Sequence, residues 1–178
     1  MVEMGIAALK IEGRYKDAEY VALATHAYRK AVDDAWARRE LSVSKEEEQQ
    51  LEQVYSRGLG PYFLSGTNHQ AVVRGRAPRH RGVKAGKVVR VDAGRIWIKP
   101  EASVSLKAGD GVVFDAADWR SPEEPEEGGR IFEVREGAKR ETELVFGNGA
   151  IRFDRIRAGD WIWRSHDQDV ERAARVYT

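Results

Sequence analysis

Residues 87–100, KVVRVDAGRIWIKP, contain the pattern that decides the fold of this 178-residue chain. Two runs rich in β-branched and aromatic residues, KVVRVD and RIWIKP, flank a short turn. Four similar runs follow, at 110–115 (DGVVFD), 129–136 (GRIFEVRE), 142–147 (TELVFG) and 160–165 (DWIWRS). Short strands separated by turn residues are typical of a small antiparallel barrel or sandwich, so we predict one of these two folds here.

Two of these runs are preceded by the same short motif. LKAGDGVVF (106–114) and IRAGDWIWR (156–164) share an aliphatic residue, a basic residue and Ala-Gly-Asp before an apolar strand. Gly109 and Gly159 can adopt the positive φ that a tight turn needs, and Asp110 and Asp160 can accept hydrogen bonds from nearby backbone. Such a turn requires no ligand, so we interpret the motif as structural.

The N-terminal third has a helical rather than a strand-like period. In residues 17–40 the apolar side chains recur at helical spacing and define one face, and Asp17 suits an N-cap. Ser44 followed by Glu47 is a capping box that predicts a second helix, with an acidic first turn that complements the helix dipole. The residues of the apolar face are Val21, Ala24, Tyr28, Ala31, Val32, Ala35 and Trp36.

Ahead of these helices, residues 5–12 (GIAALKIE) predict a short buried strand bounded by glycines. Alternation along a strand places Lys10 and Glu12 on one face, and Arg14 follows closely. In a parallel barrel this face would point inward near the end where substrates bind. The cluster has two interpretations, an anion-recognition or acid/base site and a structural ion pair.

A basic connector joins the two halves of the chain. No acidic residue occurs between Ser56 and Val91, although the 30 basic and 29 acidic residues of the whole chain nearly balance. This local cluster indicates binding to the phosphate backbone of RNA. The alternative is that its arginines pair with the acidic helices or with the acidic loop at 121–129. The candidate RNA-binding residues are Arg74, Arg76, Arg79, Arg81, Lys84 and His69.

Composition excludes several classes of chemistry. The chain has no cysteine, so it cannot form disulfides, thiol nucleophiles or cysteine-ligated metal centres. No spacing of His26, His69 or His166 favours a metal site, and no hydrolase triad or phosphate-binding glycine loop is present. We find neither a signal peptide nor an apolar run of about 20 residues, and therefore expect a soluble, cytoplasmic protein without a membrane partner.

One segment carries a specific family resemblance. LKIEGRYKDAEYVALATHAYRKAVD (9–33) resembles the end of the peptidase domain in the collagenase-like peptidases, the unassigned-type peptidase family number thirty-two. Residues 55–91 resemble the connector of the long bacterial members, and the strand-rich remainder resembles their C-terminal barrel. The resemblance covers essentially the whole chain.

This resemblance implies an α+β organisation in three parts. Residues 1–56 would be the last strand and helices of a (β/α)8 barrel, residues 57–82 the basic connector, and residues 83–178 a C-terminal antiparallel β-barrel. Lys10, Glu12 and Arg14 would lie at the mouth of the catalytic barrel, and His69 is a weaker candidate. The family's cysteine-containing motif is absent, so we expect this chain to be inactive alone and to act with a missing barrel domain or a partner chain.

The resemblance also implies two different activities within the family. Some members are described as collagen- or peptide-degrading proteases, whereas others hydroxylate a nucleotide of transfer or ribosomal RNA, with prephenate required and iron implicated. The long basic connector favours RNA hydroxylation, with this chain contributing RNA or substrate binding. The alternatives are a substrate-presenting domain of a peptidase and a non-catalytic interaction module. No cofactor is expected in this chain, and iron would belong to the parent protein.

Overall fold

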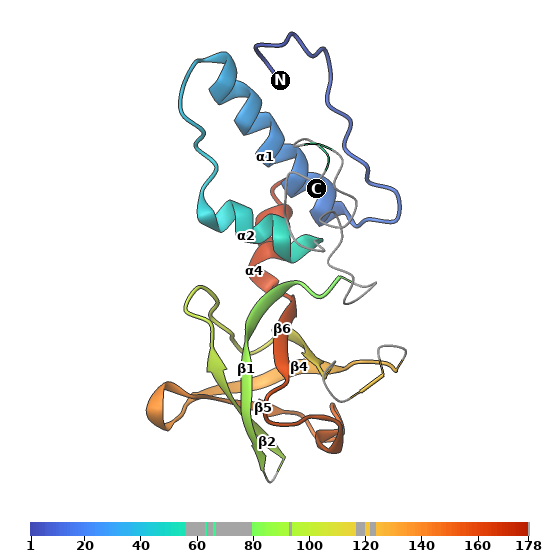
Figure 1. Cartoon of the computed structure of the whole chain (residues 1–178), viewed down its shortest axis with the longest axis vertical. Coiled ribbons are helices and arrows are strands. Elements are labelled where there is room, and N and C mark those ends of the chain that lie inside the picture. The colour runs from blue at the N-terminus through green and yellow to red at the C-terminus, as the bar shows by residue number, and fades with distance from the viewer. Residues whose placement is uncertain are drawn as a thin grey trace.

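The computed structural model describes residues 1–55, 63, 66, 80–92, 94–116, 120, 121 and 124–177. Helices from both ends of the chain gather at one end of the molecule, and a β-barrel forms the other end (Figure 1). This arrangement confirms the predicted α+β class. Within the described residues, no helix has both the length and the apolar character that crossing a bilayer demands.

The helices begin where the sequence places their caps. Helix α1 spans Ala18–Trp36, and the Asp17 side chain accepts a hydrogen bond from the Tyr20 amide. Helix α2 spans Lys45–Val54, and Ser44 and Glu47 form the predicted capping box. A third helix, α4 (Gln168–Ala174), packs against α1 through Leu23, Val170 and Ala174.

All six predicted strands are present and form a closed antiparallel barrel rather than a sandwich. The order around the barrel is β1-β2-β5-β4-β3-β6. The strand bounds are β1 Val83–Asp92, β2 Arg95–Pro100, β3 Gly111–Asp115, β4 Glu127–Glu136, β5 Thr142–Phe146 and β6 Trp161–His166. Two short 3-10 helices, Ala138–Arg140 and Phe153–Arg155, lie beside β5 in the sequence.

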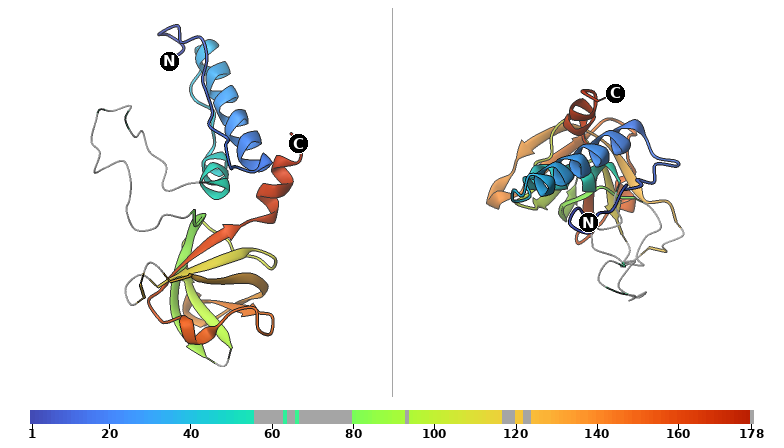
Figure 2. Two further views of the ribbon diagram at one scale, coloured as in Figure 1. Left: turned by 90° about the vertical axis from the view of Figure 1, so that its right-hand side faces the viewer. Right: turned by 90° about the horizontal axis from the view of Figure 1, so that it is seen from above.

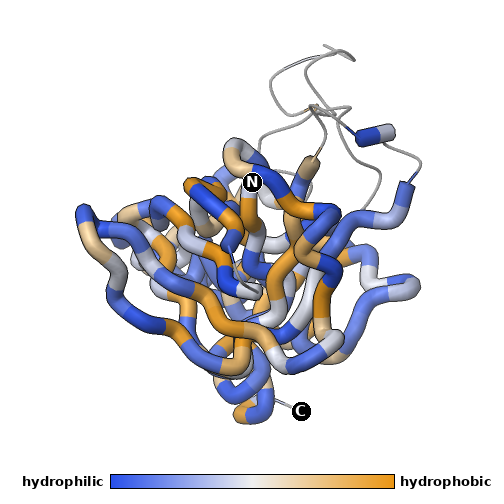
Figure 3. The backbone as a smooth tube through the Cα atoms, turned by 90° about the horizontal axis from the view of Figure 1, so that it is seen from below, coloured by the Kyte–Doolittle hydropathy of each residue, from blue (hydrophilic) through white to orange (hydrophobic). Residues whose placement is uncertain are grey.

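The barrel interior is filled by alternate residues of these strands. Figure 3 shows hydrophobic and hydrophilic positions interspersed along the chain when the molecule is viewed from the barrel end. Alternation of this kind lets each strand bury one face in the core and expose the other. The fully buried core side chains include Ile96, Ile98, Val112, Phe114, Ile131, Leu144 and Ile162.

The repeated Ala-Gly-Asp motif forms the same turn twice, as predicted. Gly109 and Gly159 have φ values of 93° and 100°. Asp110 accepts a hydrogen bond from the Lys107 amide at 3.1 Å, and Asp160 accepts one from the Arg157 amide at 2.8 Å. Each turn also exchanges two backbone hydrogen bonds with one residue of another strand, Ile131 in β4 or Val88 in β1. The two turns therefore make equivalent hydrogen bonds to strands of the barrel, one turn to β4 and the other to β1.

The prediction of a strand at residues 5–12 is wrong for this chain. Residues 6–13 form no strand and run alongside α1 instead (Figure 2). A strand requires a hydrogen-bonded neighbour, and none of the six barrel strands pairs with this segment. The apolar pattern alone is therefore not sufficient to form a strand in the described part of this chain.

Candidate functional site

Lys10, Glu12 and Arg14 lie on the surface of this chain. Lys10 Nζ lies 2.8 Å from Glu12 Oε1, and the two side chains are 84% and 72% exposed. Arg14 is also exposed. Lys10 and Glu12 therefore form an ion pair, as one of the two interpretations expects. The pair is exposed to solvent and does not lie in an enclosed site.

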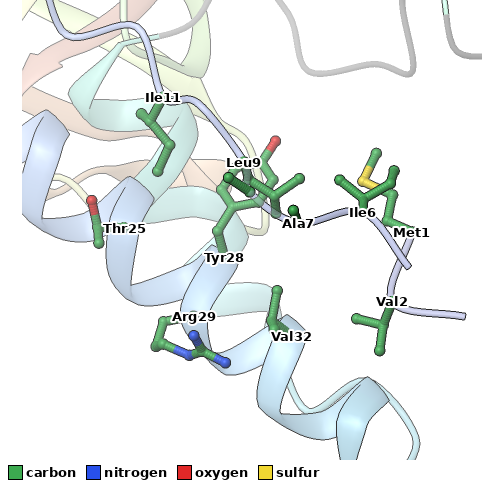
Figure 4. Close-up of a pocket in the computed structure, with 11 residues that line it drawn as sticks. Met1, Val2, Ile6, Ala7, Leu9, Ile11, Thr25, Tyr28, Arg29 and Val32 are labelled. Carbon is green, nitrogen blue, oxygen red and sulfur yellow. The ribbon is translucent and has the colours of Figure 1, made fainter. Parts of the chain in front are cut away.

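The segment that carries this ion pair forms an apolar groove with α1 (Figure 4). Ile6, Leu9 and Ile11 line one wall, and Tyr28 and Val32 line the other. The groove has a volume of about 260 Å³. It lies beside Tyr28 and Val32 of the predicted apolar face of α1, whereas Ala24 of that face is buried, as are Leu23, Ala27 and Asp34.

That predicted face of α1 remains largely exposed in the described structure. Tyr28 is 51% exposed and Trp36 is 78% exposed. Two large exposed apolar side chains about two turns apart make this side of the helix a candidate interaction surface. Val21, Met4, Ile6 and Leu9 extend the exposed apolar surface beside them.

The structure describes only some of the candidate RNA-binding residues. His69, Arg74, Arg76 and Arg79 lie outside the described residues. Arg81 is largely buried, with Nη1 2.8 Å from Asp115 Oδ2 and Nη2 paired with Glu126. Because Glu126 belongs to the acidic loop at 121–129, Arg81 follows the alternative interpretation, in which that loop neutralises the connector.

Lys84 has a different environment on the outside of β1. Its Nζ lies 3.3 Å from the ring centroid of Trp161 and 3.6 Å from Glu101 Oε1. The side chain is 38% exposed, so its ammonium group remains accessible. Sequence reasoning identified Lys84 but missed Trp161, because their proximity depends on the pairing of strands about 75 residues apart.

The helical end is joined to the barrel by buried polar contacts that sequence reasoning also missed. The Gln53 amide nitrogen donates to the Arg164 main-chain oxygen at 2.8 Å, and Arg164 Nε donates to Gln53 Oε1 at 2.9 Å. Arg164 Nη1 also lies 2.9 Å from Asp167 Oδ2. His80 contacts the Gln53 carbonyl oxygen at 2.9 Å and stacks on Tyr55. These contacts fix α2 against β6.

Beside this junction is a polar cavity of about 500 Å³. Carboxylates of Asp17, Glu19 and Glu171 line it together with Arg130 and His166. Asp167 adds a fourth carboxylate, so carboxylates outnumber the single arginine in this lining, and no particular ligand is indicated. Within the described part of the chain, no three histidine, aspartate or glutamate side chains converge as metal ligands. The described residues thus do not fit an iron site.

Comparisons with known proteins agree with the resemblance seen at residues 9–33. Residues 1–74 match the family model described as peptidase family U32. The tRNA hydroxylation protein P1 of Bacillus subtilis is 41% identical over 68 residues, which are 38% of this chain and 16% of that protein. An uncharacterized protease of Methanocaldococcus jannaschii is 32% identical over 112 residues, which are 60% of this chain and 28% of that protein. The chain thus covers less than a third of either relative.

Proposed function

We propose, on the premise that residues 1–74 are a peptidase family U32 segment, that this chain forms part of a protein that hydroxylates RNA in a prephenate-dependent reaction. In this proposal the N-terminal segment and α1 dock on further U32 residues, and the β-barrel contributes RNA binding. The reaction itself takes place in those further residues.

The observation that carries the proposal is the 41% identity to a tRNA hydroxylation protein over 68 residues. The exposed apolar face of α1 supports the docking step, because its burial would remove Tyr28 and Trp36 from water. The unpaired segment at 6–13 supports it as well, since neighbouring strands would satisfy its backbone. Docking would also place Lys10 and Glu12 at the rim of the completed site.

Gene deletion tests this function directly. RNA from the deletion strain and its parent is digested to nucleosides, and hydroxylated nucleosides are measured by mass spectrometry. We expect one hydroxylated nucleoside to disappear, to return when the whole gene is restored, and to decline when prephenate synthesis is blocked. Unchanged levels of every hydroxylated nucleoside in the deletion strain would contradict the proposal.

A peptidase is the second candidate, because the relative that matches the larger share of this chain is named as a protease. In this case the barrel would present a protein substrate to the same completed site. The test is hydrolysis of gelatin by the full protein, with this chain alone as the control. Gelatin hydrolysis by the full protein together with unchanged RNA nucleosides would favour the peptidase.

A further inference from the structure

Five residues on the outside of the barrel form a surface that we call the lysine–tryptophan face. They come from β1, β2 and β6, which are adjacent in the closed barrel. Lys87 lies directly opposite Lys99 on one side and opposite Trp161 on the other. Lys84 lies opposite Trp163. The face consists of Lys84, Lys87, Lys99, Trp161 and Trp163.

A β-bulge brings two of these lysines to the same side of β1. Residues three apart on a regular strand point to opposite faces, so Lys84 and Lys87 would normally separate. The register of β1 with β6 shifts between Lys84 and Gly86, and the extra residue restores Lys87 to the outer side. Consequently both ammonium groups approach one indole ring, with Nζ atoms 3.3 Å and 4.9 Å from the Trp161 centroid.

The positive charge of this face is poorly compensated. Lys84 has one carboxylate neighbour, Glu101 at 3.6 Å. Within the described residues, neither Lys87 nor Lys99 forms an ion pair. Like charges directly opposite each other on paired strands are destabilising, so this arrangement costs the isolated protein stability.

Several arginines elsewhere on the same barrel are ion-paired. Arg95 lies 3.4 Å from Glu143, and Arg135 contacts both Glu133 and Glu143 at 2.6 Å and 3.6 Å. Arg155 lies 3.2 Å from Glu127. These ion-paired arginines contrast with Lys87 and Lys99 of the lysine–tryptophan face.

We propose that the lysine–tryptophan face binds single-stranded RNA, with the three lysines contacting successive phosphates. The choice of RNA rests on the proposed function, whereas the requirement for a polyanion comes from the charge of the face. Cations beside aromatic rings are typical of surfaces that hold one nucleic acid strand. Trp161 positions the ammonium groups of Lys84 and Lys87, and a bound phosphate relieves their mutual repulsion.

Fluorescence anisotropy of the 178-residue chain with a labelled single-stranded RNA of about 12 nucleotides tests this site. The test variant is Lys84→Gln, Lys87→Gln and Lys99→Gln combined. At about 50 mM salt we expect its affinity to be about tenfold weaker. The slope of log K against log salt concentration should become shallower by about 2, since each lost phosphate contact on a single strand contributes about 0.7.

Arg135→Gln is the matched control, because it removes one positive charge from an ion-paired position on the other side of the barrel. It should leave the affinity within about twofold. Equal binding by the triple variant and the unaltered chain would overturn the proposal. An equal loss in the Arg135→Gln variant would overturn it too, because binding would then follow net charge alone.

Photo-crosslinking of the unaltered chain to the same RNA makes the test independent of variant folding. Crosslinks should map to peptides that contain residues 84–99 or 161–163, and crosslinks confined to other peptides would contradict the site. No measurable RNA binding, with capture of a protein partner by this face, would also contradict it. RNA binding at this face with unchanged nucleosides in the deletion strain would instead refute the proposed function alone.

Discussion

Gln53 of α2 and Arg164 of β6 hold each other through two reciprocal hydrogen bonds across 111 residues of sequence. Both side chains are nearly excluded from solvent, at 3% and 8% exposure. The side-chain amide of Gln53 donates a hydrogen bond to a main-chain carbonyl oxygen of β6. The Arg164 guanidinium donates a hydrogen bond to the side-chain oxygen of Gln53. This pair fixes the helical end of the molecule to the barrel, so removing it should destabilise both the helices and the barrel.

Replacing Gln53 with alanine should lower the free energy of unfolding by about 2–3 kcal/mol, because a buried guanidinium and a carbonyl each lose a partner. Urea unfolding measures the change. Gln49→Ala on the same helix is the control, since Gln49 makes one exposed hydrogen bond to Ser103. That control should change stability by no more than about 0.5 kcal/mol. Equal effects of the two variants would contradict the role of the Gln53–Arg164 pair.

Gly82 should not tolerate a side chain. It has φ +78°, and an added Cβ would lie 1.9 Å from the Arg164 carbonyl oxygen. Gly149 has φ +71° with open space around it, so Gly149→Ala isolates the cost of the backbone conformation. We expect thermal unfolding to show a loss of about 1 kcal/mol for Gly149→Ala and more than about 3 kcal/mol for Gly82→Ala. Similar losses would show that β6 does not approach Gly82 this closely.

The contact between α1 and α2 should weaken in acid. The hydrogen bond from Lys30 and the Ser44 backbone hydrogen bond lower the pKa of Glu47 from 4.5 to about 2. A carboxyl with a lowered pKa stabilises the fold above its unfolded value and loses that contribution as pH falls through the folded value. Stability should therefore decline between pH 4.5 and about 2.

Unfolding followed by circular dichroism measures the contribution of Glu47 as the difference in the free energy of unfolding between the unaltered chain and the Glu47→Gln variant. The difference should be about 1–2 kcal/mol at neutral pH and should vanish near the lowest pH. Glu46→Gln, at an exposed position in the same helical turn, should show no comparable difference. A pH-independent difference for Glu47→Gln would contradict the prediction.

The two faces of α1 should respond differently to substitution. Leu23→Ala removes a buried side chain that packs on Val170 and Ala174, and should cost about 2–4 kcal/mol. Tyr28→Ser, on the exposed face, should change stability of the chain by less than about 1 kcal/mol. If the exposed face docks on residues outside this chain, as proposed, the same Tyr28→Ser change should weaken association with them in a pull-down. Unimpaired association would argue against docking through this face.

Most of the fold is predictable from local patterns. The six strands follow from short runs rich in β-branched and aromatic residues separated by turn residues, and Asp17 and Ser44 mark helix starts through hydrogen bonds within one turn. The segment at 6–13 shows the limit of such patterns. Its composition suits a strand, but a strand forms only when another strand supplies hydrogen bonds.

The candidate site was less accessible to sequence reasoning. The pairing of Arg81 with Asp115 and Glu126 depends on the folded positions of β3 and of the acidic loop, each more than 30 residues away. The convergence of Lys84 and Lys87 on Trp161 depends on a bulge and on strand pairing, neither of which a charge count reveals. Local charge made Lys84 a candidate, whereas only the closed barrel identifies its neighbours.

Complementation of the deletion strain tests the link between RNA hydroxylation and the barrel most directly. The full gene carrying Lys84→Gln, Lys87→Gln and Lys99→Gln, or Arg135→Gln alone, is restored, and the hydroxylated nucleoside lost on deletion is measured by mass spectrometry. We expect the triple variant to restore a small fraction of the modification and Arg135→Gln to restore it fully, with equal protein levels. Full restoration by the triple variant would contradict the claim that this face of the barrel holds RNA for hydroxylation.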